Sequence, residues 1–231
     1  MTGRVAIVTG GAGALGQAVT LRLLAAGAAV GVPWIVDAER ARLEAAVPAA
    51  HRGRLLLERA DVTDDAAMAA FAGAVRARHG RLDVLVALVG GFAGGALVDT
   101  DRATWDRMLA LNLTSAFTAA RAVVPHMVAA GHGRVVTIGS RAVVPPAAGF
   151  IAYTAAKAGV IAMTRALAME LRGTGVTANC VLPSTMDTPA NRAAMPGADR
   201  KGWVPVEAVA DAIAFLVRDE SGHVNGTLME V

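Results

Sequence analysis

Two side chains that can exchange protons stand one helical turn apart. Tyr153 is the only tyrosine in the chain, and Lys157, one of only two lysines, follows it four positions later. Residues at i and i+4 share one face of a helix, so the ammonium group can approach the phenol and lower its pKa from the usual value of about 10. Such a tyrosine could donate or accept a proton near neutral pH. The alternative is a helix surface with one aromatic side chain and one solvated cation.

Two further polar residues precede this pair and complete a candidate catalytic set. Ser140 follows a strand-like run at residues 134–139, which predicts its hydroxyl at the carboxyl edge of a sheet. A capping serine is the alternative. Asn112 lies inside the helical stretch 105–120, where an interior asparagine has no reason of helix propensity to occur.

A glycine-rich turn lies near the start of the chain, between an apolar run at residues 5–8 and an alanine-rich helix. The turn reads Thr9-Gly10-Gly11-Ala12-Gly13-Ala14-Leu15-Gly16. Glycines let a pyrophosphate approach the backbone, and the N–H groups of a helix N-terminus favour its negative charge. The order of strand, turn and helix predicts a dinucleotide site. Its expected contacts are Gly10, Gly13, Ala14, Leu15 and Gly16, and a tight structural turn is the alternative.

The residue that binds the adenosine ribose is expected at the end of the second strand, roughly 20 residues after the turn. An ungapped count reaches Trp34, whereas a short insertion around residues 31–33 brings the count to Asp37. A carboxylate there would accept hydrogen bonds from the ribose and repel a 2′-phosphate. The glycine turn also has no basic residue, so NAD is expected in preference to NADP. Asp37 could instead cap the helix that follows.

The elements that must position these residues alternate along the whole chain. Short β-branched runs predict strands at residues 5–8, 30–36, 55–60, 84–89, 134–138, 177–181 and 227–231. Alanine-rich stretches predict helices at residues 15–26, 38–46, 64–79, 101–130, 153–172 and 205–217. This alternation predicts an α/β fold, a single-domain Rossmann-type doubly wound parallel β-sheet of about seven strands with helices on both faces, over residues 1–231. Ligands bind such sheets beyond the carboxyl ends of the strands.

Composition and charge exclude several other classes of protein. A hydrophobic content of 55% excludes a disordered chain, and the net charge of +3 without basic runs gives no reason to expect nucleic-acid binding. One cysteine and scattered histidines predict neither disulfides nor a metal site, and indicate a reducing cytoplasm. The uncharged run at residues 84–98 is shorter than the roughly 20 apolar residues of a spanning helix, so no membrane association is expected.

Taken together, these motifs resemble the short-chain dehydrogenase/reductase family over essentially the full length of the chain. The matching elements are Thr9-Gly10-x-x-x-Ala14-Leu15-Gly16, Asp61-Val62, Asn112, Ser140, Tyr153-x-x-x-Lys157 and Asn179-x-Val181-x-Pro183 leading to Thr188. The resemblance implies NAD or NADP as cofactor and a homodimer or homotetramer formed through the long helices.

The resemblance also implies a role for each matching residue. Tyr153 would be the general acid/base, Lys157 would lower its pKa and hold the nicotinamide ribose, and Ser140 would polarise the substrate oxygen. Asn112 would support a proton-relay water. The implied cofactor contacts are Asp61 and Val62 beside the adenine, Thr188 at the nicotinamide carboxamide, and Gly90, Pro183 and Thr185.

The chain departs from the family pattern at three places. Ala87-Leu88-Val89-Gly90 stands where the family usually has Asn-Asn-Ala-Gly, Ala14 replaces a glycine, and Ser184 follows Pro183 in place of a glycine. The first departure removes polar contacts on the adenine-ribose side. Residues 182–203 are locally similar to dihydropteridine reductases, and residues 184–204 are expected to form a mobile substrate lid.

The predicted function is hydride transfer between a nicotinamide cofactor and a small-molecule carbonyl or secondary alcohol. The side chains around the expected pocket are largely apolar, and only Arg141 or Arg192 could bind a carboxylate. Two alternatives remain: a dihydropteridine-type reductase, and a nucleotide-binding or sensor protein without catalysis.

Overall fold

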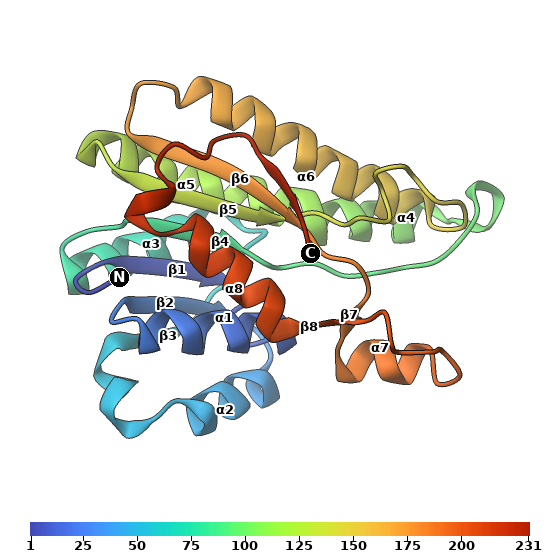
Figure 1. Cartoon of the computed structure of the whole chain (residues 1–231), viewed down its shortest axis with the longest axis horizontal. Coiled ribbons are helices and arrows are strands. Elements are labelled where there is room, and N and C mark those ends of the chain that lie inside the picture. The colour runs from blue at the N-terminus through green and yellow to red at the C-terminus, as the bar shows by residue number, and fades with distance from the viewer.

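A parallel sheet of seven strands crosses the centre of the molecule (Figure 1). The structure is a computed structural model that describes all of residues Met1–Val231. The strands lie in the order β3-β2-β1-β4-β5-β6-β9, so the direction of winding reverses between β1 and β4. The strands are β1 Val5–Thr9, β2 Ala29–Trp34, β3 Leu55–Arg59, β4 Val84–Ala87, β5 Gly133–Ile138, β6 Val176–Leu182 and β9 Leu228–Glu230. The predicted doubly wound fold is therefore confirmed.

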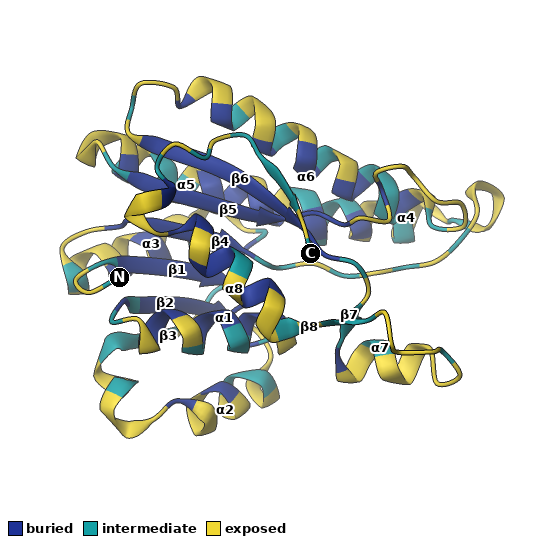
Figure 2. Ribbon diagram, viewed as in Figure 1, coloured by how far each residue is buried: buried dark blue, intermediate teal, exposed yellow.

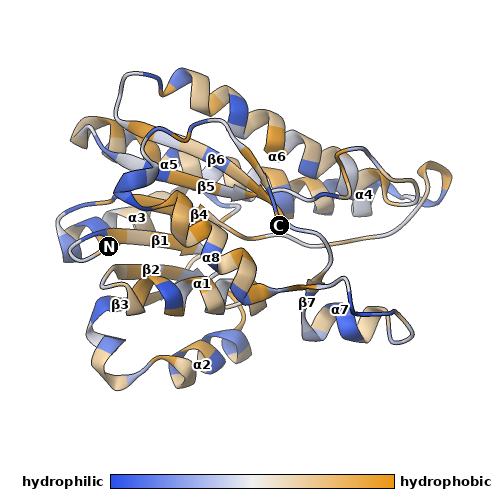
Figure 3. Ribbon diagram, viewed as in Figure 1, coloured by the Kyte–Doolittle hydropathy of each residue, from blue (hydrophilic) through white to orange (hydrophobic).

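Helices cover both faces of this sheet and bury the alternating side chains of its strands. In β1, Ala6 and Val8 belong to the apolar core on one face, whereas Val5 and Ile7 belong to the core on the other. The first face is covered by α1 Ala14–Ala25, α2 Asp37–Ala46 and α8 Val206–Leu216, and the second by α3 Asp65–His79, α5 Ser115–Ala130 and α6 Ile151–Glu170. Figure 2 shows the strands buried between these layers, and Figure 3 shows how apolar they are.

The second strand is shorter than predicted. It ends at Trp34, not at residue 36, and it pairs with β1 only as far as Gly31. Pro33 lies beyond that ladder, where its lack of an N–H group breaks no hydrogen bond to β1. The end of β2 therefore leaves β1 before its last residues, and Pro33 and Trp34 line an open cleft.

Helix ends follow the capping signals of the sequence. The Asp64 side chain accepts from the backbone N–H of Ala67 at 2.8 Å at the start of α3. Asp101 accepts in the same way from Thr104 at 2.7 Å at the start of α4 Arg102–Leu109. Gly80 ends α3 with a φ of 80°, a left-handed conformation that glycine adopts without strain.

The unbroken helix predicted over residues 101–130 is interrupted. Between α4 and α5, residues Ala110–Thr114 form one wider π-helical turn, and Asn112 lies at its centre. Such single π turns are frequent at functional sites. By length and apolar composition Arg102–Ala130 is the one stretch that could cross a membrane. Its apolar character has a reason within the fold, because Ala119, Val123 and Met127 pack into the core beneath the sheet.

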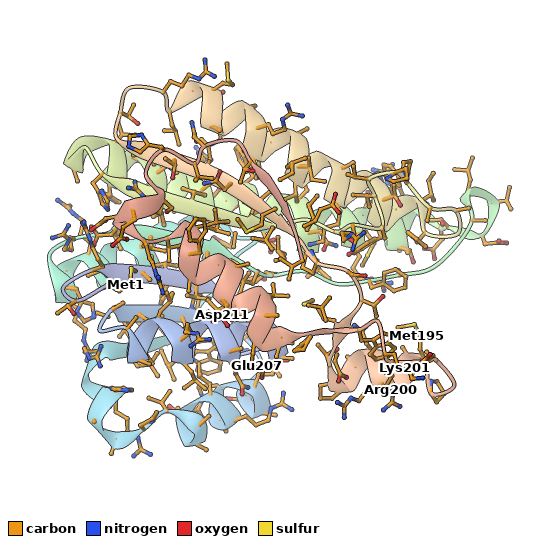
Figure 4. The ribbon with its side chains drawn as sticks, viewed as in Figure 1. Met1, Met195, Arg200, Lys201, Glu207 and Asp211 are labelled. Carbon is orange, nitrogen blue, oxygen red and sulfur yellow. The ribbon has the colours of Figure 1, made fainter.

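The predicted lid segment contains structure that the sequence did not indicate. β7 Met186–Asp187 pairs with β8 Val204–Pro205, and α7 Pro189–Ala194 lies between them. Met195, Arg200 and Lys201 are at the outer corner of this excursion, away from the sheet (Figure 4). Closure of this segment over a substrate, and its relation to dihydropteridine reductases, stay predictions.

Paired charges close the amino-terminal edge of the sheet. The Asp83 carboxylate, 3% exposed, accepts from the backbone N–H of Val5 at 2.8 Å and from the guanidinium groups of Arg4 and Arg81 at 3.1 and 2.6 Å. Arg4 also donates to both oxygens of Asp219 at 2.8 Å. These ion pairs join β1, β4 and the segment after α8.

Candidate active site

A cleft of about 350 Å³ lies beyond the carboxyl ends of the central strands. Its lining comes from the turn after β1, the end of β2, the segment after β3 and the turn after β4. Eight of the predicted cofactor residues line it, namely Gly10, Gly13, Ala14, Leu15, Gly16, Asp61, Val62 and Gly90. The structure thus brings together residues that are up to 80 positions apart in the chain.

The glycine turn forms a cradle that larger side chains would fill. Gly10 has a φ of 66°, and a Cβ on it would lie 3.0 Å from the backbone of Leu88. A Cβ on Gly16 would overlap the carbonyl oxygen of Gly10. No side chain caps the N-terminus of α1 after Gly13, so its first N–H groups remain free for an anion. The buried Thr9 Oγ1 and Trp34 Nε1 also have no hydrogen-bond partner. These features fit a dinucleotide.

The end of β2 differs from the prediction for the ribose ligand. Asp37 is the first residue of α2, its side chain is 80% exposed, and it does not line the cleft. Trp34 and Glu39 do line it. The guanidinium of Arg40 stacks over the Trp34 ring at 5.1 Å from its centroid and pairs with Glu44 at 2.6 Å. Sequence counting missed Glu39, since only the fold turns the first turn of α2 toward the cleft.

The unusual turn after β4 is held by Asn112. The Asn112 side chain accepts from the N–H of Gly91 at 3.2 Å and donates to the carbonyl oxygens of Gly91 and Met108, both at 3.0 Å. A Cβ on Gly90 would lie 2.7 Å from Asn112 Oδ1 and 3.3 Å from Lys157 Nζ. The amide therefore fixes a close approach that apolar Leu88 and Val89 cannot fix by themselves.

Lys157 is buried without a carboxylate partner. Its side chain comes from α6, only 4% of the residue is exposed, and Nζ donates to the carbonyl oxygen of Ile138 at 3.0 Å. Burial lowers the pKa of this ammonium to about 8, and the neighbouring Cys180 thiol opposes the shift. The Lys157 ammonium can therefore exchange its proton at a pH near 8.

The phenol of Tyr153 behaves differently from the expectation. Burial raises its pKa above the usual 10.0, while a hydrogen bond with the Ser140 hydroxyl lowers it. The lowering by Lys157 that the i and i+4 spacing predicts is not found in the protein alone. Spacing along a helix places Lys157 on the same face, but its Nζ donates to the carbonyl oxygen of Ile138, and the loss of water around the phenol is the largest effect on its pKa.

Ser140 and the segment after β6 meet at the same edge. The N–H of Gly139 donates to Val181 at 2.8 Å, and the N–H of Arg141 donates to Pro183 at 3.0 Å, so the two strand ends are tied together. Thr188 is buried and caps α7 by accepting from the N–H of Asn191 at 3.2 Å. Pro183, Thr185 and Thr188 do not line the 350 Å³ cleft, so their cofactor contacts stay predictions.

Two phenylalanines next to the phenol were not part of the predicted site. Phe92 lies with its ring centroid 5.1 Å from that of Tyr153, and Phe150 lies 6.2 Å from it, both in edge-to-face arrangements. Their own centroids are 5.7 Å apart. Phe150 is three residues before Tyr153, so the sequence indicated that the two could be close. Nothing in the sequence indicated that Phe92 would contact Tyr153.

Comparison with known proteins agrees with this geometry. A model of the short chain dehydrogenase family matches residues 4–198. The (2S)-[(R)-hydroxy(phenyl)methyl]succinyl-CoA dehydrogenase subunit BbsD of Thauera aromatica is 37% identical, over 99% of this chain and 94% of its own length. The 2-dehydro-3-deoxy-L-rhamnonate dehydrogenase (NAD(+)) of a Sphingomonas strain is 39% identical, over 81% of this chain and 74% of its own.

A solved structure gives the same answer for the whole fold. The crystal structure of levodione reductase superposes with a TM-score of 0.92 and 26% identity, over 100% of this chain and 96% of that one. The glycine cradle, the buried lysine and the tyrosine beside a serine all lie at the edge where such proteins bind their ligands. This chain belongs to the short-chain dehydrogenase/reductase family of oxidoreductases.

Proposed function

We propose that this protein is an NAD-dependent dehydrogenase or reductase that interconverts a secondary alcohol and a ketone. Two observations carry the proposal: the Tyr153 phenol is hydrogen-bonded with the Ser140 hydroxyl, and the buried Lys157 lies against the Gly90 turn, which lines the cleft of the glycine cradle. A redox sensor needs the cradle, but it does not need a hydroxyl pair and a buried amine placed next to it.

The residues of the site would divide the reaction between them. A bound nicotinamide supplies or accepts the hydride. The Tyr153 phenol donates a proton to the substrate oxygen in reduction and removes it in oxidation, and the Ser140 hydroxyl donates a hydrogen bond to the same oxygen. Lys157 exchanges a proton near its pKa of about 8 and stabilises negative charge on the phenol oxygen. Asn112 positions the turn that separates the cleft from this lysine.

The charges of the cleft support NAD as the cofactor. Its lining contains two carboxylates, Glu39 and Asp61, and no arginine, lysine or histidine. The 2′-phosphate of NADP would find no cation in this lining to pair with, and the two carboxylates would repel it. Glu39 takes the role that the sequence suggested for Asp37. The Sphingomonas relative is named for NAD(+), which is consistent with this choice.

The first experiment is a fluorescence titration of the purified protein with NADH and with NADPH. We expect saturable binding of NADH, with NADPH weaker by about tenfold, which corresponds to about 1.4 kcal/mol of repulsion. Glu39→Gln should narrow this ratio, whereas Asp37→Asn, the matched control outside the cleft, should leave it unchanged. Binding of neither nucleotide would reject the proposal, and tighter binding of NADPH would reject the role of Glu39.

A steady-state assay then tests the chemistry. Secondary alcohols with NAD⁺, and ketones with NADH, should show turnover that follows nucleotide absorbance. Saturable nucleotide binding without turnover of any alcohol or ketone would favour the non-catalytic alternative.

The assembly that we propose is a homodimer or homotetramer formed through α4, α5 and α6. Apolar side chains on the outer faces of these helices support it: Phe117 on α5 and Met169 on α6 are each about half exposed. Light scattering at the elution peak of a sizing column would measure the mass, and a monomer at micromolar concentration would contradict the proposal.

A further inference from the structure

The phenol of Tyr153 is bordered by two phenyl rings that nothing in the proposed chemistry requires. We name Phe92 and Phe150 the aromatic wall. Phe92 meets the Tyr153 ring at an interplanar angle of 67° and Phe150 meets it at 72°. Proton transfer by the phenol needs neither ring, so the wall has a separate role.

Phe92 remains at the surface although its loop is well anchored. Its exposed fraction is 65%, which is large for a phenylalanine beside a half-buried tyrosine. Gly91, immediately before it, exchanges two hydrogen bonds with Asn112. Gly95, after it, donates to Gly149 at 2.7 Å and accepts from Ile151 at 3.3 Å. The ring is thus held in place with one part of its surface open to an incoming apolar group.

The loop that carries Phe92 has further apolar side chains before it reaches Asp99. Figure 3 shows the segment leading into α4 in the colours of hydrophobic residues, and Figure 2 shows it exposed. Leu97 and Val98 at its far end are exposed and belong to no aromatic contact. Substitution of these two residues therefore serves as a control, because they are apolar side chains of the same loop that lack an aromatic ring.

The cations near the site are already neutralised. Arg141 pairs with Glu230 at 3.2 Å, and Arg192 holds Asp187 through two hydrogen bonds, one of 2.7 Å. These were the two residues that could have bound a substrate carboxylate. With both paired, neither arginine offers a free positive charge to a substrate carboxylate, and the Lys157 ammonium is buried.

From these observations we infer that the aromatic wall selects a substrate whose reacting carbon carries an uncharged aromatic ring, a benzylic secondary alcohol or its aryl ketone. The inference rests on the proposed function. Oxidation of the alcohol would transfer the carbinol hydrogen with two electrons to the nicotinamide and the hydroxyl proton to the Tyr153 oxygen, which leaves the ketone. Aromatic rings in edge-to-face or offset contact gain free energy beyond the burial of area, so the ring matters more than apolar bulk.

The test compares three alcohols that differ only in the group on the carbinol carbon: 1-phenylethanol, 1-cyclohexylethanol and 2-butanol. The wild-type kcat/KM should be highest for the phenyl compound. Phe92→Leu keeps an apolar side chain but removes the ring, and should lower kcat/KM for 1-phenylethanol about 3- to 10-fold, with 2-butanol changed less than twofold. Phe92→Tyr should retain the preference, and Val98→Ala should match wild type for all three.

A binding measurement separates this inference from the proposed function. The dissociation constant of acetophenone, measured by ligand-detected NMR with and without NADH, should rise about 3- to 10-fold in Phe92→Leu and stay within twofold in Val98→Ala. Equal kcat/KM values for the three alcohols, or an unchanged dissociation constant of acetophenone in Phe92→Leu, would overturn the role of the aromatic wall. Turnover of 2-butanol in that case would still support the proposed oxidoreductase function. Acetophenone binding that depends on Phe92, without turnover of any alcohol, would support the aromatic wall and reject the proposed oxidoreductase function.

Discussion

The two edges of the same sheet treat their polar groups in opposite ways. At the amino-terminal edge, the buried carboxylate of Asp83 is met by two guanidinium groups and a backbone N–H. At the carboxyl edge, the buried ammonium of Lys157 has one carbonyl oxygen and no carboxylate, and Thr9 Oγ1 and Trp34 Nε1 have no partner.

This difference separates what stabilises the fold from what is kept for ligands. A buried charge is destabilising unless it is paired and hydrogen-bonded, and Asp83 at the amino-terminal edge meets that condition. The carboxyl edge does not, so its polar groups cost stability in the protein alone and remain open for new contacts. Because parallel strands all end at one edge, this division follows from the topology.

Loss of the phenol oxygen should have the largest effect. Tyr153→Phe removes the group that moves the proton, so turnover should fall about 10²- to 10⁴-fold. The dissociation constant of NADH and the free energy of unfolding should change little, because the ring and its aromatic contacts remain. Stopped-flow or steady-state absorbance measures the rate, and turnover equal to wild type would refute the role of Tyr153.

Loss of the paired carboxylate at the opposite edge should affect stability alone. Asp83→Ala leaves the buried N–H of Val5 without its acceptor and removes the partner of Arg81, and should reduce the free energy of unfolding by about 1–3 kcal/mol in urea titrations. The kcat per folded molecule should match wild type. A loss of kcat with little loss of stability would show that the two edges are not independent.

Removal of the unpaired ammonium should stabilise the protein while it abolishes activity. Lys157→Met should raise the free energy of unfolding at pH 7 by about 1–3 kcal/mol, since the folded ammonium is disfavoured by burial. The folded lysine loses its proton at about pH 8 and the unfolded one at 10.5, so the unfolded state binds more protons between these values. Wild-type stability should therefore rise over this range relative to the variant, and the difference between the two should shrink.

The pH dependence of stability is compared between wild type and Lys157→Met because Cys180 also contributes to it. Burial raises the pKa of Cys180, so this thiol lowers stability as pH rises, and it does so in both proteins. Subtracting the two curves removes the contribution of groups that Lys157 does not affect and leaves that of Lys157 together with its coupling to Cys180. A variant less stable than wild type at pH 7 would show that Lys157 supports the fold.

An exposed ion pair away from both edges should have the smallest effect. Arg121 on α5 lies 2.7 Å from Asp65 on α3, and both side chains are more than half exposed. Asp65→Ala should change the free energy of unfolding by less than about 1 kcal/mol, and less still in high salt. A change as large as that of Asp83→Ala would mean that burial does not explain the contrast between the edges.

The sequence alone determined the features that depend on neighbours along the chain. Strand runs, the glycine turn before α1 and the spacing of Tyr153 and Lys157 are local patterns, because a strand repeats every two residues and a helix every 3.6. These patterns were sufficient for the order of elements, and hence for the fold and the edge at which the site lies.

Only the tertiary structure decided what meets across that edge. It turned Glu39 toward the cleft and left Asp37 outside, placed Asn112 against the turn after β4, and brought Phe92 to the Tyr153 ring. It also reversed the expected direction of the phenol pKa, since burial outweighs the hydrogen bond with Ser140. The physical reason is that burial and contact between distant segments arise from packing of the whole chain, and no pattern of neighbouring residues records them.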